Sequence, residues 1–153
     1  MTPSSAGKSG SEIIALLGLQ PHPEGGHYVE TYRGPLDGAE RPPGSAIYYL
    51  LAEGEFSRWH RIDATEIWHW YAGAPLELRI SEGAGSVQMT HLGHDFAAGE
   101  RPQVIVPPFV WQAARSLGPW TLVGCTVNPA FTFSGFELAP TGWEPGHRGG
   151  SPG

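Results

Sequence analysis

The chain carries RWHRIDATEIWHWYAG at residues 58–73, and this stretch does most to decide the fold. Apolar and aromatic residues run on both sides of a polar turn at 63–65. That pattern predicts two short strands joined by a tight turn. Within the stretch, His60, Glu66 and Gly73 stand in the spacing His-x5-Glu-x6-Gly. A second marked stretch, PPFVWQ at 107–112, follows further along the chain.

Strand patterns continue on both sides of this stretch. We expect strands at 27–33, 45–52, 56–62, 66–71, 76–80, 87–92, 104–106, 111–115, 120–127 and 131–138. One helix is expected at 11–18, capped by Ser9 or Ser11 and ended by Gly18. Many short strands with a single helix predict an all-β sandwich or barrel, and a jelly roll fits the spacing. The folded domain is expected at 11–140, with mobile tails at 1–10 and 141–153.

The composition fits one globular domain and argues against several classes of protein. The 153 residues include six Trp, five Tyr and six Phe, too many large rings for a disordered chain. The formal charge of −6 argues against a nucleic-acid partner, which needs a basic surface. The single cysteine, Cys125, cannot form an internal disulfide, and we expect a buried thiol. Because there is no long apolar run and no signal-peptide pattern, we expect a cytoplasmic protein without a membrane partner.

Several further segments agree, in order, with one branch of the cupin superfamily. They are HPEGG at 22–26, ETYR at 30–33, IYYLL at 47–51, EIWH at 66–69, HLG at 91–93, VPP at 106–108, WQA at 111–113 and CTVNPAF at 125–131. Over about 11–140 the chain resembles the cupin subfamily catalogued as a domain of unknown function. The resemblance implies a double-stranded β-helix, or jelly-roll barrel, that forms a homodimer. It also implies a shape like that of dTDP-sugar 3,5-epimerases (RmlC-like) and plant storage globulins.

Metal-dependent cupins carry two histidines and a glutamate in the first motif and a third histidine in the second. In this sequence His60 and Glu66 match the first histidine and the glutamate. Ile62 and Gln112 stand where the other two histidines would be. A zinc or iron site normally needs three or four protein ligands. The resemblance therefore implies a pocket with half of its metal cage missing. We expect no cofactor, and a divalent metal only if His60, Glu66 and Gln112 together hold it.

Alternation along the two central strands predicts which side chains enter the barrel. Arg58, His60 and Ile62 share one face of the first strand, and Glu66 and Trp68 share one face of the second. We expect both sets to point inward. A glutamate among aromatic rings loses solvation, which raises its pKa, and a histidine beside it can exchange a proton near neutral pH. His60 is the expected base and Glu66 its partner or the acid, so these two are the candidate catalytic residues.

Anion-binding and stacking side chains complete the expected pocket. Arg33 or Arg58, with Arg79 as a third candidate, could hold a carboxylate, phosphate or enolate through paired hydrogen bonds. Glu24 either lines the mouth of the pocket or belongs to a turn allowed by the two glycines that follow it. His22 is expected in a loop. The other candidate substrate-binding residues are Tyr49, Trp68, Trp111 and Gln112.

Three functions are compatible with this pocket. The first is a small-molecule enzyme, an isomerase or epimerase that acts on a sugar-like or carbonyl substrate by acid–base chemistry without a metal. The second is a metal-dependent oxygenase or lyase that uses His60, Glu66 and Gln112. The third is a ligand-binding module without catalysis, so whether the protein is an enzyme stays open. Three phenylalanines at 131–136 are expected to pack on the barrel or on a second subunit.

Overall fold

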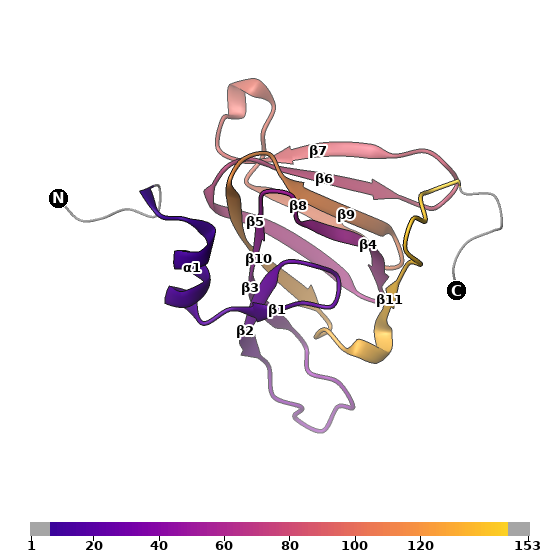
Figure 1. Cartoon of the computed structure of the whole chain (residues 1–153). Coiled ribbons are helices and arrows are strands. Elements are labelled where there is room, and N and C mark those ends of the chain that lie inside the picture. The colour runs from indigo at the N-terminus through magenta and orange to yellow at the C-terminus, as the bar shows by residue number, and fades with distance from the viewer. Residues whose placement is uncertain (1–6, 147–153) are drawn as a thin grey trace.

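Two antiparallel sheets pack face to face in the computed structural model, which describes residues 7–146 (Figure 1). The six-stranded sheet has the order β1-β2-β3-β10-β5-β8, and the five-stranded sheet has the order β11-β4-β9-β6-β7. The elements are α1 (Gly10–Leu17), β1 (Gln20–Pro21), β2 (His27–Arg33), β3 (Ser45–Ala52), β4 (Phe56–Ile62), β5 (Thr65–Gly73), β6 (Leu76–Ser81), β7 (Gln88–Leu92), η2 (Phe96–Ala98), β8 (Gln103–Val106), β9 (Trp111–Ser116), β10 (Trp120–Asn128), η3 (Phe133–Gly135) and β11 (Phe136–Leu138). This arrangement is a jelly roll, so the expected all-β fold class is confirmed.

The strand boundaries follow the sequence patterns closely, with two exceptions. The expected strand at 131–138 is a strand only at β11, because the short 3-10 turn η3, capped by Thr132, precedes it. The second exception is β1, a two-residue strand whose sequence carries no alternation that could have indicated it.

Helix α1 begins and ends where its sequence signals lie. The Ser9 hydroxyl accepts from the backbone N–H of Glu12, and the Glu12 carboxylate accepts from the backbone N–H of Ser9, which forms a capping box. Gly18 adopts a left-handed conformation with φ 68° and ends the helix. Ile13 is buried against Leu50 on the outer side of the six-stranded sheet (Figure 1). No helix in residues 7–146 has the length and apolar character needed to cross a membrane.

Side chains from both sheets form the main core. It contains Tyr49, Leu51, Trp68, Leu76, Leu78, Leu92, Val106, Ala114, Val123 and Cys125. Each large apolar side chain in such a cluster stabilises the fold by about 1.5–3 kcal/mol. Cys125 is a free, buried thiol within this core, as expected from the sequence. The polar side chains of the barrel interior lie next to this core.

Strand β4 contains an irregularity that changes which side chains enter the barrel. Its register with β9 shifts between Ser57 and His60, so the residues between them form a β-bulge. Ser57 and His60 are 0% and 2% exposed, although strict alternation would place them on opposite faces. Arg58 lies instead on the outer face, where its guanidinium donates to the Ala139 carbonyl oxygen at 3.0 Å. The expectation that Arg58 shares the inward face of His60 is therefore wrong.

The chain beyond the expected domain boundary packs on the outer face of the five-stranded sheet. Trp143 is only 6% exposed, and its ring centroid lies 4.6 Å from that of Trp111. Trp59 packs at the edge of the same cluster. The ordered domain thus extends past residue 140, to at least 146. The outer parts of the expected tails at 1–10 and 141–153, namely residues 1–6 and 147–153, lie outside the described residues.

Candidate functional site

A cavity of about 420 Å³ opens inside the barrel and is the candidate site. Its lining residues are Gln20, His22, Glu24, Tyr28, Glu30, Arg33, Ser45, Ile47, His60, Ile62, Glu66, Cys125, Val127, Phe131, Thr132 and Phe133. The volume suits a small organic molecule. The cavity brings together His60 and Glu66, the two residues paired by the sequence spacing, and adds a second histidine and two further glutamates to them.

His60 enters the cavity from β4 with a fixed ring orientation. Its Nδ1 lies 2.7 Å from the Arg58 carbonyl oxygen, which can only accept, so Nδ1 carries the proton. The neutral ring therefore keeps its lone pair on Nε2. Phe136 packs against the ring with a centroid separation of 5.5 Å. Burial lowers the pKa of His60 and outweighs the opposite effects of the Glu66 carboxylate and the Arg58 carbonyl. His60 is thus a neutral imidazole that can accept a proton at Nε2.

Glu66 enters the cavity from β5, on the other sheet, and two further side chains hold it. The indole N–H of Trp68 can only donate, and it donates to Gln112 Oε1 at 2.7 Å. This contact sets the orientation of the Gln112 amide, whose Nε2 donates to Glu66 Oε1 at 2.8 Å. Burial raises the pKa of Glu66 to about 7. Glu66 is therefore a positioned carboxyl group that exchanges its proton near neutral pH.

Glu24 reaches the cavity from the tight turn between β1 and β2. Gly25 has φ 112°, and a side chain there would collide with the Phe56 carbonyl oxygen, so only glycine lets this turn lie against β4. The Ser57 hydroxyl donates to Glu24 Oε2, and His60 Nδ1 lies 3.3 Å from the same oxygen. Both expectations for Glu24 hold together, because it belongs to a glycine turn and also lines the cavity.

His22 completes the polar cluster. The backbone N–H of Glu24 donates to His22 Nδ1 at 3.1 Å, so the neutral ring holds its proton on Nε2. Glu24 Oε1 lies 3.4 Å from that same Nδ1, a contact that is favourable when the carboxyl is protonated. Burial raises the pKa of Glu24 to about 8, and burial followed by the charge of His60 lowers the pKa of His22 to about 4. At neutral pH two uncharged imidazoles and a mostly uncharged Glu24 therefore line the cavity together with Glu66.

The buried carboxyls predict a fall in stability as pH rises. A carboxyl with a higher pKa in the folded than in the unfolded chain stabilises the fold below its unfolded pKa, and this contribution is lost as pH rises through the folded value. For Glu24 and Glu66 that window runs from 4.5 to about 8. Below pH 6.5, His22 and His60 oppose the effect, because folding lowers their pKa values. The net loss is expected between pH 6.5 and about 8 and amounts to about 2 kcal/mol of unfolding free energy.

Urea unfolding across this pH window measures the effect. Glu24→Gln should remove most of the fall in unfolding free energy with pH, because the folded-state pKa of Glu24, about 8, is the higher of the two carboxyl values. Glu40→Gln is the control, since Glu40 is exposed and should leave the slope unchanged. A wild-type stability that stays constant or rises from pH 6.5 to about 8 would contradict the uncharged state of the cluster.

The exposed part of the cavity lining carries an ion pair and aromatic rings. Arg33 donates to both carboxylate oxygens of Glu30, at 3.1 and 2.9 Å, and to the Phe131 carbonyl oxygen at 2.8 Å. Arg33 lines the cavity, as expected, but Glu30 compensates its charge. Tyr28, Phe131 and Phe133 supply flat rings to the same lining, and Phe133 is 57% exposed. This part of the lining suits an uncharged, partly apolar ligand.

Six expected substrate-binding residues do not line the cavity. Arg58 and Arg79 line a different cavity on the outer face of the five-stranded sheet. Trp111 is buried on that outer face as well, since its neighbour Gln112 takes the inward position on β9. Tyr49 and Trp68 lie in the core, where Tyr49 donates to the Gly25 carbonyl oxygen. Gln112 acts one step away from the cavity, by holding Glu66.

Sequence reasoning missed one residue of the cluster and underrated another. His22 lies in the loop between β1 and β2, as expected, but its side chain is only 4% exposed and lines the cavity. The signal for it lies in the HPEGG segment, where Gly25 lets the turn lie against β4 and Gly26 lets it lie against β3, so that His22 and Glu24 face the cavity. Cys125 lines the cavity beside Glu66 in addition to belonging to the core.

Comparison with known proteins agrees with this geometry. The model of the family described as Cupin_5, cupin superfamily (DUF985), matches residues 11–139. The chain belongs to this cupin family. A crystal structure of a protein from Shewanella oneidensis is 39% identical, with 86% of this chain and 84% of that chain covered and a TM-score of 0.81. A hypothetical protein from Leishmania major is 26% identical, with 85% and 86% covered and a TM-score of 0.78. No curated protein matches the cupin.

More distant cupins share the fold and bring a metal into consideration. Oxalate decarboxylase from Bacillus subtilis, described with Mn(II) centres, is 13% identical and has a TM-score of 0.59. The likeness covers 90% of this chain and 33% of that chain, and it shows the fold alone. The side chains of this cupin therefore decide whether a divalent metal fits.

The donor set in this cavity does not fit a cupin metal centre. His60 Nε2 and the Glu66 carboxylate are two donors, fewer than a stable site needs. The Gln112 amide oxygen accepts a hydrogen bond from Trp68, and the amide N–H group faces Glu66, so Gln112 does not offer its oxygen to a metal ion. His22 keeps its proton on the nitrogen that would have to bind. Among residues 7–146, no group of three or more His, Cys, Asp or Glu side chains is placed to hold a metal ion.

Proposed function

We propose that this cupin is a metal-independent isomerase or epimerase that moves a proton beside the carbonyl group of an uncharged, sugar-like substrate. The observation that carries the proposal is a neutral base and a titrating acid on opposite sheets, His60 on β4 and Glu66 on β5, lining one cavity. Two such groups on facing walls can hold a small molecule between them and move its protons.

His60 serves as the base. Its Nδ1–H is held by the Arg58 carbonyl oxygen, so Nε2 is the nitrogen that takes the proton. The positive charge that then develops on the ring is stabilised by that carbonyl and by Glu24 Oε2, which lies 3.3 Å from Nδ1. Because His60 is uncharged at neutral pH, no proton has to leave it before the reaction begins.

Glu66 serves as the acid. With a pKa of about 7 it is substantially protonated at neutral pH and can donate to a carbonyl oxygen of the substrate. Gln112 keeps the carboxyl in place through Oε1, and Trp68 keeps Gln112 in place. These two residues position the acid without contacting the substrate themselves.

The proposed step breaks the C–H bond beside the carbonyl. The proton moves to His60 Nε2, the electron pair forms the C=C bond of an enol, and the Glu66 proton moves to the carbonyl oxygen. Return of the His60 proton to the neighbouring carbon of an enediol gives an isomer, and Glu66 takes back a proton from the oxygen that becomes the new carbonyl. An epimer forms when water supplies the proton on the opposite face of the same carbon, His60 releases its proton to solvent, and Glu66 takes back the enol proton. Both side chains then regain their starting protonation states, so no oxidant or reductant is needed.

The lining favours an uncharged reacting group. At neutral pH Glu24 is mostly uncharged and Glu66 is partly ionised, while Glu30 compensates Arg33, so the cavity offers no excess positive charge to an anion. Tyr28 and Phe131 offer ring faces on which a sugar can pack. Together these features support a carbonyl-containing sugar or a related hydroxyketone as the substrate class.

Solvent deuterium exchange tests the proposal. The protein is treated with a chelator and incubated in D₂O with a panel of uncharged aldoses, ketoses and hydroxyketones, and the C–H signals beside each carbonyl are followed by NMR. We expect one class of compound to lose such a signal at a rate proportional to the protein concentration. If compounds of the panel bind but none of them exchanges its C–H proton, the result would contradict the proposed enzymatic activity and support a ligand-binding module.

A further inference from the structure

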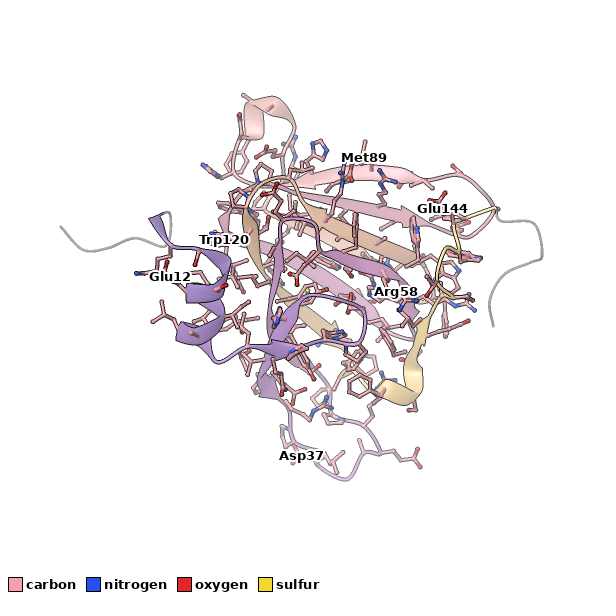
Figure 2. The ribbon with its side chains drawn as sticks, viewed as in Figure 1. Glu12, Asp37, Arg58, Met89, Trp120 and Glu144 are labelled. Carbon is pink, nitrogen blue, oxygen red and sulfur yellow. The ribbon has the colours of Figure 1, made fainter. Side chains whose placement is uncertain are left out.

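A second cavity, of about 450 Å³, lies on the outer face of the five-stranded sheet. Strands β4, β6 and β9 contribute its floor, and residues 139–144 of the C-terminal segment form one wall. No residue lines both this cavity and the one that holds His60 and Glu66. Figure 2 shows Arg58 and Glu144 on this flank, beside the C-terminal segment. The two cavities are therefore separate binding spaces.

Two arginines in this second cavity converge on one buried carboxylate. Arg115 Nε donates to Glu77 Oε2 at 2.5 Å, and Arg79 Nε lies 3.4 Å from the same oxygen. The Glu77 side chain is 6% exposed, whereas those of Arg79 and Arg115 are 46% and 47% exposed. The terminal guanidinium nitrogens of both arginines donate no side-chain hydrogen bond within residues 7–146. One carboxylate thus anchors two guanidinium groups and leaves their outer nitrogens available to a ligand.

A third arginine joins the wall of the cavity to its floor. Arg58 donates to the Ala139 carbonyl oxygen at 3.0 Å and to the Thr141 hydroxyl at 3.2 Å. The lining holds three arginines against Glu77 and the exposed Glu144, which leaves one excess positive charge. The whole chain has a formal charge of −6, so this cavity has the opposite sign to the protein as a whole. Such a local excess favours an anionic ligand.

Aromatic side chains line the cavity beside these charges. Trp59 and Trp143 meet edge to face with ring centroids 6.1 Å apart, and Phe56 is 56% exposed at the rim. The Trp143 indole N–H is buried and has no acceptor within residues 7–146. A buried donor without a partner is uncommon in folded proteins. The wall can therefore pack against a flat ring and still has a donor to satisfy.

We propose that this second cavity binds a phosphomonoester carried on a flat ring system, the chemistry of a nucleoside monophosphate. The guanidinium groups of Arg79 and Arg115 match the geometry of phosphate oxygens. Trp59, Trp143 and Phe56 supply the apolar surface for the ring. The volume lies in the range of small-molecule sites. The inference does not depend on the reaction proposed for the other cavity.

Calorimetric titration of the full chain with AMP tests this inference, with inorganic phosphate and adenosine titrated separately as its two halves. We expect one AMP to bind per chain, more tightly than either half, and its affinity to fall as salt concentration rises. Arg79→Gln should weaken AMP binding about tenfold, the effect of losing one charge-assisted hydrogen bond. Arg101→Gln removes an arginine outside the cavity and should leave AMP binding unchanged.

Arg79 is the first choice for substitution because its contact with Glu77 is the longer of the two, so Glu77 keeps Arg115 as its partner. Arg115→Gln is a second variant with the same expected loss. Wild-type affinity for AMP in both variants would overturn the inference, and so would the absence of AMP binding to folded wild-type protein. Glu66→Gln should bind AMP normally, which separates a failure at this cavity from a failure of the proposed reaction.

Discussion

Replacing Glu66 with glutamine is expected to slow deuterium exchange by about 10²- to 10⁴-fold, the usual contribution of a general acid or base. The variant keeps the shape of the side chain, and its amide oxygen can still accept the hydrogen bond that Gln112 donates at 2.8 Å. The variant loses the acidic proton that Glu66 donates to the substrate. Because burial raises the pKa of Glu66 to about 7, the wild-type rate should fall as pH rises above 7. The residual rate of Glu66→Gln should lack this fall.

Glu30→Gln is the matched control for this experiment. Glu30 lines the exposed part of the same cavity, and its loss is expected to change KM while leaving kcat largely intact. Thermal unfolding above pH 7 should show Glu66→Gln to be at least as stable as the wild type, because the variant no longer buries an ionised carboxylate. A Glu66→Gln protein that exchanges as fast as the wild type would remove Glu66 from the reaction.

Replacing His60 with glutamine should have an effect of similar size, about 10²- to 10⁴-fold, since it removes the Nε2 lone pair that takes the substrate proton. Glutamine is preferable to alanine here. His60 is 2% exposed, and truncation to alanine would leave a cavity that destabilises the barrel. The wild-type rate should also fall as pH drops through the lowered pKa of His60, and the residual rate of His60→Gln should not.

The control for this second variant is His91→Gln, because His91 is an exposed histidine outside the cavity. Rates are compared at each pH after circular dichroism has shown that both variants are folded. If His60→Gln keeps the acidic limb of the pH profile, another group is the base, and His22 is the first alternative because it lines the same cavity.

The strands could be predicted because alternation along a chain reports directly on burial. The pattern of apolar and polar residues at 27–33, 45–52 and 56–62 marks β2, β3 and β4 at their observed ends. Alternation fails where the backbone departs from regular pairing. The bulge between Ser57 and His60 reverses the facing of Arg58, and no local property of the residues between them announces it.

The pairing of His60 with Glu66 could be predicted because both belong to one short motif. The roles of Gln112 and Trp68 could not, since they depend on which amide atom faces which neighbour in three dimensions. The inward position of His22 depends on a turn that only a glycine at residue 25 permits. These contacts join segments far apart in sequence, and their geometry is absent from any single segment.

The second cavity could not be predicted from the sequence either. Its arginines come from β4, β6 and β9, and most of its wall, residues 141–144, comes from a segment that the composition assigned to a tail. Trp143 explains the difference, because a single large ring buried against Trp111 is enough to bring a Gly- and Pro-rich segment onto the barrel.

The central claim is that this cupin moves protons with its own side chains. The most direct test is the exchange rate of untagged protein, purified without nickel resin, whose metal content is measured on the same sample by elemental mass spectrometry. The account predicts that chelation removes any bound metal while the exchange rate stays unchanged. Loss of exchange on chelation, with recovery when Mn²⁺ or another divalent ion is restored, would contradict the account and make His60 and Glu66 metal ligands.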